Sequence, residues 1–339
     1  MSEAVPSERS DASFLRGTLA VDVEAETHRI VEHLRESVVK RFSRQGAVVG
    51  VSGGIDSSVA LALSVRAFGP ERVVALILQE KESSPENPAL ARELCRAYGT
   101  MPVAEDITAA LEGFGCYRRR DEAIREVIPE YDSTYHCRIT LPANLLDSDA
   151  VGLFSVTVIS PEGQQQTKRL PLRQYLRVVA ATNFKQRTRM AMLYNCAEGH
   201  NYAVIGTANK NERGQGFFVK YGDGGADVDA IAHLYKTQVY QLGAYLGVPE
   251  SIRRRTPTTD TYSAPTTEEE FFFRLPFETM DRLWYAEEHR LPVEEVAQAM
   301  QLTPQQVARA YREFAQRRRS TDYLRSQVVA LPPEDSGPR

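Results

Sequence analysis

The sequence has few of the features that mark secreted, zinc-binding or membrane proteins. Its 339 residues include only four cysteines, which lie far apart and form no CxxC pair, so neither a disulfide framework nor a zinc site is expected. No apolar run approaches the ~18 residues that span a bilayer, and the N-terminus lacks the basic start and apolar stretch of a signal peptide. The net charge of −4 gives no reason to expect a nucleic-acid or membrane partner. These absences predict a cytoplasmic protein with neither kind of partner.

A composition of 42% hydrophobic and 25% charged residues is that of a globular chain with a substantial core. We expect one domain over residues 17–330, between a disordered N-terminus at 1–16 and a disordered tail at 331–339.

Short valine-rich runs alternate with helical patterns in the first part of this domain. Buried parallel strands are predicted at 47–52, 72–79 and 101–107. Helices are predicted at 21–44, 57–69 and 87–99, the last two ending at glycine. This βαβαβ alternation predicts an α/β fold with a doubly wound parallel sheet, in which ligands bind at the carboxyl ends of the strands.

The pattern changes at residues 116–175, which we interpret as an insertion. It holds a charged helix, a strand-like run at 135–141 and two β-rich runs around a Pro-Glu-Gly turn, as in a hairpin. A long helix at 173–201 and a strand at 202–208 then resume the α/β theme, and residues 266–325 form a helical C-terminal region.

The loop between the first strand and its helix reads SGGIDSS from Ser52 to Ser58. Its backbone N–H groups, hydroxyls and helix N-terminus would converge on one anion. The alternative is that the glycines only form a turn and that Asp56 or Ser57 only caps the helix. Both the lysine-containing phosphate loop and the G-x-G-x-x-G fingerprint are absent. Because Asp56 would repel phosphate oxygens unless Mg²⁺ bridged them, a metal-bound pyrophosphate is implied.

This loop resembles that of the N-type ATP pyrophosphatases, which share an adenine nucleotide α-hydrolase-like fold. The segment from Asn183 to Gln238, with "YAVIGTANKNERGQGFFVKYGDGGADVDAIAHLYKTQ", resembles the core of the NAD synthetase family within that superfamily. The resemblance implies an ammonia-dependent ligase that adenylates the nicotinate carboxylate of deamido-NAD, releases pyrophosphate, and lets ammonia displace AMP. It also implies a homodimer with the acceptor site at its interface.

The resemblance further implies roles for individual residues. Mg²⁺ would be held by Asp56 and Glu212, and Asp223 would act on the incoming ammonia. The residues that would hold ATP are Gly50, Val51, Ser52, Gly53, Gly54, Ile55, Asp56, Ser57, Ser58, Thr207, Lys236 and Thr258. Those that would contact deamido-NAD are Arg187, Phe217, Lys220 and Asp227.

The residue types suit these roles. Lys236 would place a positive charge on phosphates whose charge grows as pyrophosphate leaves, and Asp223 could orient ammonia and take its proton. Phe217 offers a flat apolar surface for a pyridine ring. Taken singly, however, each lysine could be a surface charge, Phe217 a core residue and Glu212 a helix cap.

Other features leave alternatives open. The insertion precedes the helix of Arg187 and could remodel the acceptor site, so an amide ligase that adenylates a different carboxylate is the main alternative. The family's C-terminal His-Lys-Arg tail is missing, and Arg317, Arg318 and Arg319 are candidate substitutes. Residues 292–319 resemble a helix-turn-helix with a Thr303–Gln306 capping box, which would suit a non-catalytic regulator. No glutaminase domain fits in this length, so ammonia would be free or supplied by a separate protein.

Overall fold

The computed structural model describes residues 17–141, 144–146 and 154–331. The two termini predicted to be disordered, 1–16 and 331–339, lie outside these residues except for Leu331. Five parallel strands form the central sheet in the order β3-β2-β1-β7-β8. The strands are β1 (Ala47–Gly50), β2 (Val73–Gln79), β3 (Pro102–Asp106), β7 (Ala203–Gly206) and β8 (Val228–Asp229). The strand order changes direction on either side of β1, and such a switch point is where ligands bind in open α/β sheets.

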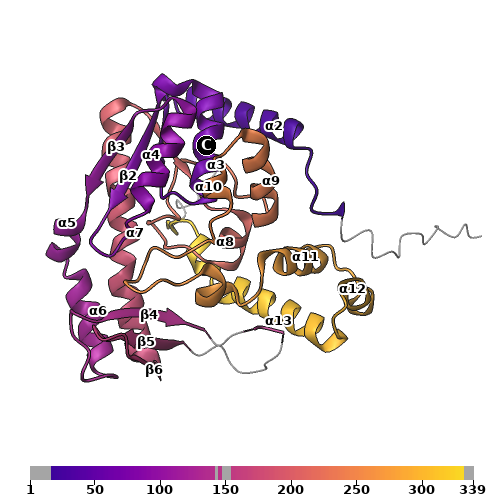
Figure 1. The fold of residues 1–339 in the computed structure, drawn as a ribbon. Helices are drawn as coiled ribbons and strands as arrows, with labels where there is room; N and C mark the ends of the chain where they lie inside the picture. Colours follow the sequence, from indigo (N-terminus) through magenta and orange to yellow (C-terminus); the bar gives the residue numbers. More distant parts are fainter. Residues whose placement is uncertain (1–16, 142–143, 147–153, 332–339) are drawn as a thin grey trace, which may run out of the picture.

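Helices cover both faces of this sheet, as the doubly wound prediction requires (Figure 1). On one face, Val49, Ala75 and Ile205 are buried in a core shared with α2, α3, α4 and α9. On the other face, Val48 and Val204 pack against the long helix α7. Successive strand residues therefore point to opposite sides, and both sides are apolar, as in a fully buried parallel sheet. The bounds of these helices are α2 (Val23–Arg35), α3 (Ile55–Phe68), α4 (Asn87–Tyr98), α7 (Leu172–His200) and α9 (Lys236–Leu246).

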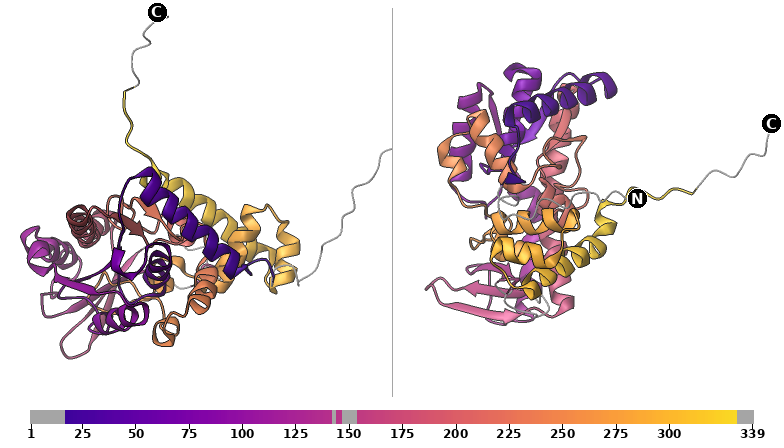
Figure 2. Two further views of the ribbon diagram at one scale, coloured as in Figure 1. Left: turned by 90° about the horizontal axis from the view of Figure 1, so that it is seen from above. Right: turned by 90° about the vertical axis from the view of Figure 1, so that its right-hand side faces the viewer.

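Residues 116–175, which the sequence analysis interprets as an insertion, contain a separate three-stranded antiparallel sheet, β4-β5-β6. Its strands are β4 (His136–Thr140), β5 (Ser155–Ile159) and β6 (Gln165–Arg169), preceded by α6 (Cys116–Arg125). The predicted hairpin is confirmed, and Gly163 in its turn has φ of +82°, a conformation that favours glycine. The right-hand view of Figure 2 places this small sheet at one end of the molecule and α2 at the other, with the C-terminal helices between them.

The predicted helical C-terminal region is also present. After η3 (Glu269–Phe273), a short π-helix, come α11 (Phe277–Glu288), α12 (Val293–Met300), α13 (Pro304–Ser320) and α14 (Asp322–Arg325). The predicted capping box of Thr303 and Gln306 starts α13. The only tryptophan of the chain, Trp284 on α11, is buried, and its ring lies so close to Gly214 that a Cβ there would overlap it.

Some elements differ from the prediction. The helix expected at 21–44 is α2 followed by a π-helix, η1 (Glu36–Arg41). Four short elements carried no recognisable pattern: α5 (Thr108–Gly113), β8, α8 (Lys210–Gln215) and α10 (Glu250–Arg253). Among the described residues, no helix combines the length and apolar character needed to cross a membrane.

Candidate active site

A cavity of about 410 Å³ lies at the carboxyl end of the central sheet. Seven residues of the predicted loop line it: Gly50, Val51, Ser52, Gly54, Ile55, Asp56 and Ser57. Gly53 and Ser58 lie behind this surface. Gly53 has φ of +81°, and a Cβ there would meet Leu90 at 3.1 Å, so glycine suits both its conformation and its packing. Ser58 is buried and donates its hydroxyl to the Gly54 carbonyl at 2.7 Å.

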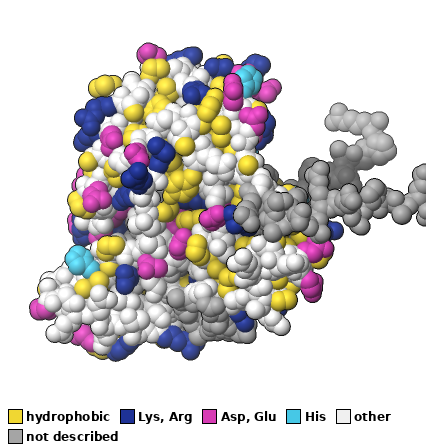
Figure 3. Space-filling view, turned by 45° about the vertical axis from the view of Figure 1, so that its right-hand side comes forward, with side chains coloured by type: hydrophobic (Ala, Val, Ile, Leu, Met, Phe, Trp, Pro, Cys, Tyr) yellow, Lys and Arg dark blue, Asp and Glu magenta, His cyan; other side chains and the backbone are white. Residues whose placement is uncertain are grey.

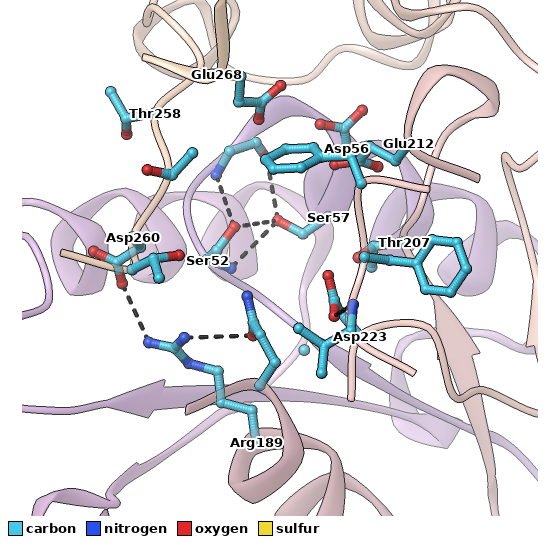
Figure 4. Close-up of a pocket in the computed structure, with 18 of the residues that line it drawn as sticks. Ser52, Asp56, Ser57, Arg189, Thr207, Glu212, Asp223, Thr258, Asp260 and Glu268 are labelled. Carbon is cyan, nitrogen blue, oxygen red and sulfur yellow. Dashed lines mark hydrogen bonds and ion pairs between the residues drawn. The ribbon is translucent and has the colours of Figure 1, made fainter. Parts of the chain in front are cut away.

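The N-terminus of α3 opens into this cavity. Its N-cap is Gly54, which supplies no capping side chain, so the first N–H groups of the helix are free of a side-chain cap. The hydroxyls of Ser52 and Ser57 lie 3.2 Å apart beside them (Figure 4). The hydroxyls and the helix N–H groups are thus brought together at one place, an arrangement that suits an anion.

Three carboxylates gather at one side of the cavity. Asp56 of α3, Glu212 of α8 and Glu268 just before η3 each offer an oxygen, and these atoms lie within 4.8 Å of one another. Lys236, fully buried at the start of α9, donates to Asp56 at 2.6 Å and to Glu268 at 3.2 Å. Glu268 is a member that the sequence analysis missed.

The electrostatics of this acid cluster favour binding of a cation. Burial and the charges of Asp56 and Glu268 raise the pKa of Glu212 well above its ordinary value. Burial alone would lower the pKa of Lys236, but the same two carboxylates raise it well above its usual range, so the lysine stays protonated. Carboxylate oxygens are the hard donors that Mg²⁺ takes, so the residues present fit that ion.

Asparagines hold the acid cluster in position. Asn209, the N-cap of α8, exchanges hydrogen bonds with Glu212 in a capping box, so Glu212 is indeed a helix cap as well as a cluster member. The Asn209 side chain also donates to Asp56 at 3.0 Å. Asn211 accepts from the backbone N–H of Lys236 at 3.0 Å and donates to Asp281, which links α8, α9 and α11. Sequence reasoning did not single out these supports.

Asp223 lines the same cavity from the glycine-rich loop after α8. Its carboxylate accepts from the Val219 N–H at 2.8 Å, and burial raises its pKa to about 6. A Cβ at Gly224 would overlap the ring of Phe218, which explains why glycine follows Asp223. A carboxylate with a pKa near 6 is suited to accept a proton at neutral pH.

Thr207 and Thr258, which are predicted to contact ATP, and Phe217, which is predicted to contact deamido-NAD, also line the cavity. The contacts themselves stay predictions. Phe217 stacks on Phe272, with ring centroids 4.7 Å apart. Phe154 also lines the cavity and stacks on Tyr175, with ring centroids 4.2 Å apart, so this part of the wall is aromatic.

Arg189 is a further lining residue that was not predicted. Figure 4 shows it across the cavity from Glu268. Its hydrogen bonds to Asp260 and Gln186 are both long, at 3.4 Å.

The other predicted acceptor contacts lie outside the lining of this cavity. Arg187 donates to the Lys220 carbonyl at 3.2 Å, and the Lys220 ammonium donates to the Ser326 carbonyl at 2.9 Å. Asp227 accepts from the Val204 N–H at 2.8 Å and from the Tyr194 hydroxyl at 3.1 Å. Their contact with deamido-NAD stays a prediction.

The candidate substitutes for the missing tail are not among the lining residues either. Arg317 is buried and donates to Gln215 at 2.9 Å, and Arg318 pairs with Glu287. Both therefore pack α13 against its neighbours.

The fold and the cavity together define an α/β nucleotide-binding protein whose site suits a polyphosphate and a divalent cation. Comparison with known proteins is more specific. The model of the NAD synthase family matches residues 26–127 and 152–327. The chain belongs to this family, so the resemblance predicted from the sequence is confirmed.

Its relatives include two named NH(3)-dependent NAD(+) synthetase. The protein from Rhizobium rhizogenes is 45% identical over 93% of this chain and 95% of its own. The protein from Rhizobium meliloti is 47% identical over 92% of both chains. Among solved structures, an NMN synthetase from Francisella tularensis and an NH3-dependent NAD synthetase from Campylobacter jejuni each align with a TM-score of 0.59 at 22% identity. They cover 93% and 92% of this chain and all of their own, and at that identity they show the shared fold.

Proposed function

We propose that the protein converts deamido-NAD to NAD with ATP and ammonia. The nicotinate carboxylate attacks the α-phosphorus of ATP, which forms an acyl adenylate and releases pyrophosphate. Ammonia then attacks the acyl carbon, AMP leaves, and the amide results. The observation that carries this proposal is the gathering of the phosphate loop, the acid cluster, Lys236 and Asp223 in one cavity of a chain from the NAD synthase family.

The first half of the reaction depends on charge placed around the phosphates. The loop and the N-terminus of α3 bind phosphate oxygens through N–H groups and hydroxyls. Asp56, Glu212 and Glu268 would hold Mg²⁺, which when bound neutralises charge on those oxygens. Lys236 is buried, and the neighbouring carboxylates raise its pKa well above the usual range, so it keeps the positive charge that stabilises the leaving pyrophosphate.

The second half depends on Asp223. Its carboxylate orients ammonia and accepts the proton that the nitrogen loses when the new bond forms. The hydrogen bond from the Val219 N–H fixes this carboxylate, and its raised pKa makes it a better proton acceptor than an exposed aspartate.

An alternative is that the same chemistry acts on a different carboxylate. The stacked pair of Phe154 and Tyr175 is the observation that favours it, because these two rings form part of the cavity wall. The similar fold of an NMN synthetase is consistent with a family that serves more than one acceptor.

Two copies of the chain would associate through α7. Leu172 and Leu176, one helical turn apart, are 71% and 56% exposed, and such apolar exposure on a helix favours an interface. The surface position of Arg187, Lys220 and Asp227 is compatible with an acceptor site completed by the partner. Sedimentation velocity should give twice the monomer mass of 38.0 kDa.

We expect the protein to work in the cytoplasm. The four cysteines are all free, which suits a reducing cytoplasm. Ammonia would come from solution or from a separate glutaminase. No nucleic-acid partner is expected, because the net charge is −4, and basic and acidic side chains are interspersed on the face drawn in Figure 3.

Turnover tests the proposal directly. Purified protein with ATP, Mg²⁺, ammonium and deamido-NAD should yield equal amounts of AMP, pyrophosphate and NAD. AMP formation only with another carboxylic acid, such as nicotinate mononucleotide, would establish the alternative. Failure to cleave ATP with any of these acceptors would contradict both.

A further inference from the structure

One wall of the cavity is a long connection between α10 and α11. We call residues 256–273 the wall segment. It contains only one isolated β-bridge, between Thr258 and Thr267, and the short η3. Ten of its residues line the cavity: Thr256, Pro257, Thr258, Thr259, Asp260, Thr261, Tyr262, Glu268, Phe271 and Phe272. It therefore supplies both a predicted ATP contact and the third member of the acid cluster.

A segment of this length with so little secondary structure is costly to order. Fixing each residue costs roughly 1–2 kcal/mol of conformational entropy, and a loop that orders only on ligand binding lowers affinity by that amount. The contacts that hold the wall segment in place thus affect how tightly a nucleotide binds.

Strand β4 of the insertion provides several of these contacts. The Ala264 N–H donates to the Cys137 carbonyl at 3.0 Å, and the Cys137 N–H donates to the Ser263 hydroxyl at 2.9 Å. The Arg138 guanidinium donates to the Pro265 carbonyl at 3.0 Å. One backbone hydrogen bond and two side-chain hydrogen bonds therefore attach residues 263–265, in the middle of the wall segment, to β4.

The insertion also reaches the end of the wall segment. The Leu141 N–H donates to the Glu270 carbonyl at 3.2 Å, two residues after Glu268. Tyr262, only 5% exposed, belongs to the apolar core of the small sheet, and Phe271 packs against that core. Backbone and apolar contacts thus attach both halves of the segment to the insertion.

A buried ion cluster gives a further anchor. Lys185 on α7 is 1% exposed and donates to the Thr261 carbonyl at 2.9 Å. Its other partners are Glu80 at 2.8 Å and Glu82 at 2.7 Å, just after β2. Arg120 of α6 pairs with Glu82 through two hydrogen bonds of 2.6 and 2.9 Å.

The strand that holds the segment lies outside the range that the family model matches. The family model matches the whole wall segment but leaves residues 128–151 unmatched, and that stretch contains β4 and Leu141. The wall segment thus lies in the part of the chain that the family model matches, whereas the strand that holds it lies outside that part.

We propose that the insertion is a positioning element that holds the wall segment in its ATP-binding arrangement before any nucleotide binds. The role rests on the proposed use of ATP at this cavity. Arg138 and Ser263 are positioning residues, since neither lines the cavity. Their loss should weaken ATP binding and leave the chemical steps nearly unchanged.

The test compares the wild type with the Arg138→Ala/Ser263→Ala double variant. Arg169→Ala is the matched control, because Arg169 is an exposed arginine on β6 of the same small sheet. Hydrogen–deuterium exchange is measured without ligand for the wall segment and for β1 and β2. Steady-state kinetics then give kcat and the KM for ATP at saturating Mg²⁺, ammonium and deamido-NAD.

In the wild type and the control, the Ala264 amide should be protected without nucleotide. The double variant should lose protection in the wall segment alone, and its KM for ATP should rise about tenfold with kcat within twofold, since each hydrogen bond is worth roughly two- to tenfold in an equilibrium constant. Unchanged protection, or an unchanged KM, would overturn the proposal. If the double variant loses protection in β1 and β2 as well, Ser263→Ala alone replaces it. A wild type that cleaves no ATP would refute the proposed function, and the exchange data would still decide whether β4 holds the segment.

Discussion

Replacing Lys236 with methionine tests the central electrostatic feature of the site. The change keeps most of the aliphatic side chain and removes the charge that pairs with Asp56 and Glu268. Because the lysine is fully buried, three carboxylates would then face one another without a cation. Removing one partner of a buried ion pair costs about 3–5 kcal/mol of stability, and loss of one preorganised charge from a transition state costs about 10²–10³ in kcat.

Two assays separate these effects. AMP release under saturating substrates measures kcat, and thermal unfolding with and without Mg²⁺ measures stability. We expect kcat to fall by about 10²–10³. We also expect Mg²⁺ to raise the melting temperature of the variant more than that of the wild type, because the ion no longer competes with the ammonium for the carboxylates of Asp56 and Glu268.

Lys236→Arg is the control, since it keeps the charge with a different shape. It should retain most of the stability while losing activity through altered geometry. A methionine variant that folds fully and keeps kcat within threefold of the wild type would refute the reasoning, because the charge would then play no part in pyrophosphate release. An equal effect of Mg²⁺ on both proteins would refute the competition for the carboxylates.

Asp223→Asn should lower amidation by about 10²–10³ while ATP–pyrophosphate exchange with deamido-NAD stays within threefold, because only ammonia attack needs the base; loss of exchange would contradict this assignment. In the wild type, kcat/KM for free ammonia should rise with pH and level off above about 6, since burial raises the pKa of Asp223 to about 6 and the protonated acid cannot accept a proton; a flat profile from pH 5 to 7 would contradict it. Burial acts to raise the pKa of Glu82, but Arg120 and Lys185 lower it to about 2 from an ordinary 4.5. The ionised Glu82 therefore contributes its full stabilisation above pH 4.5, and this contribution is lost as the pH falls towards 2. Glu82→Gln should make the unfolding free energy, measured by denaturant titration, depend less on pH in this range. If the unfolding free energy of the variant depends on pH as that of the wild type does, other carboxylates must cause the loss of stability in acid.

The main elements of the fold could be predicted because their signals are local. Buried valine-rich strands and helices that end at glycine are visible in windows of five to fifteen residues. The strand β8 has only two residues, and α8 has six, so neither completes enough periods to be detected. The strand β8 is recognised in the structure by its pairing with β7, and α8 by the capping box at its N-terminus.

The candidate site could be predicted only in part, because side-chain direction depends on the fold. Glu268 is followed by two more glutamates, and nothing in that run says which one faces Asp56. Arg189 stands two residues after Arg187 on α7. Since a helix turns about 100° per residue, these two arginines point in nearly opposite directions, one into the cavity and the other to the surface. A family resemblance transfers positions along the chain, and the packing around each position decides what it faces.

The packing of Trp284 has a practical consequence. Its indole ring lies against Gly214, two residues after Glu212 on the same short helix, and is the only indole in the chain. Intrinsic fluorescence excited at an indole-selective wavelength therefore reports on one place, the contact between α8 and α11. A ligand that shifts Glu212 would alter the surroundings of that ring, so the native chain already carries an optical probe of the short helix to which Glu212 belongs.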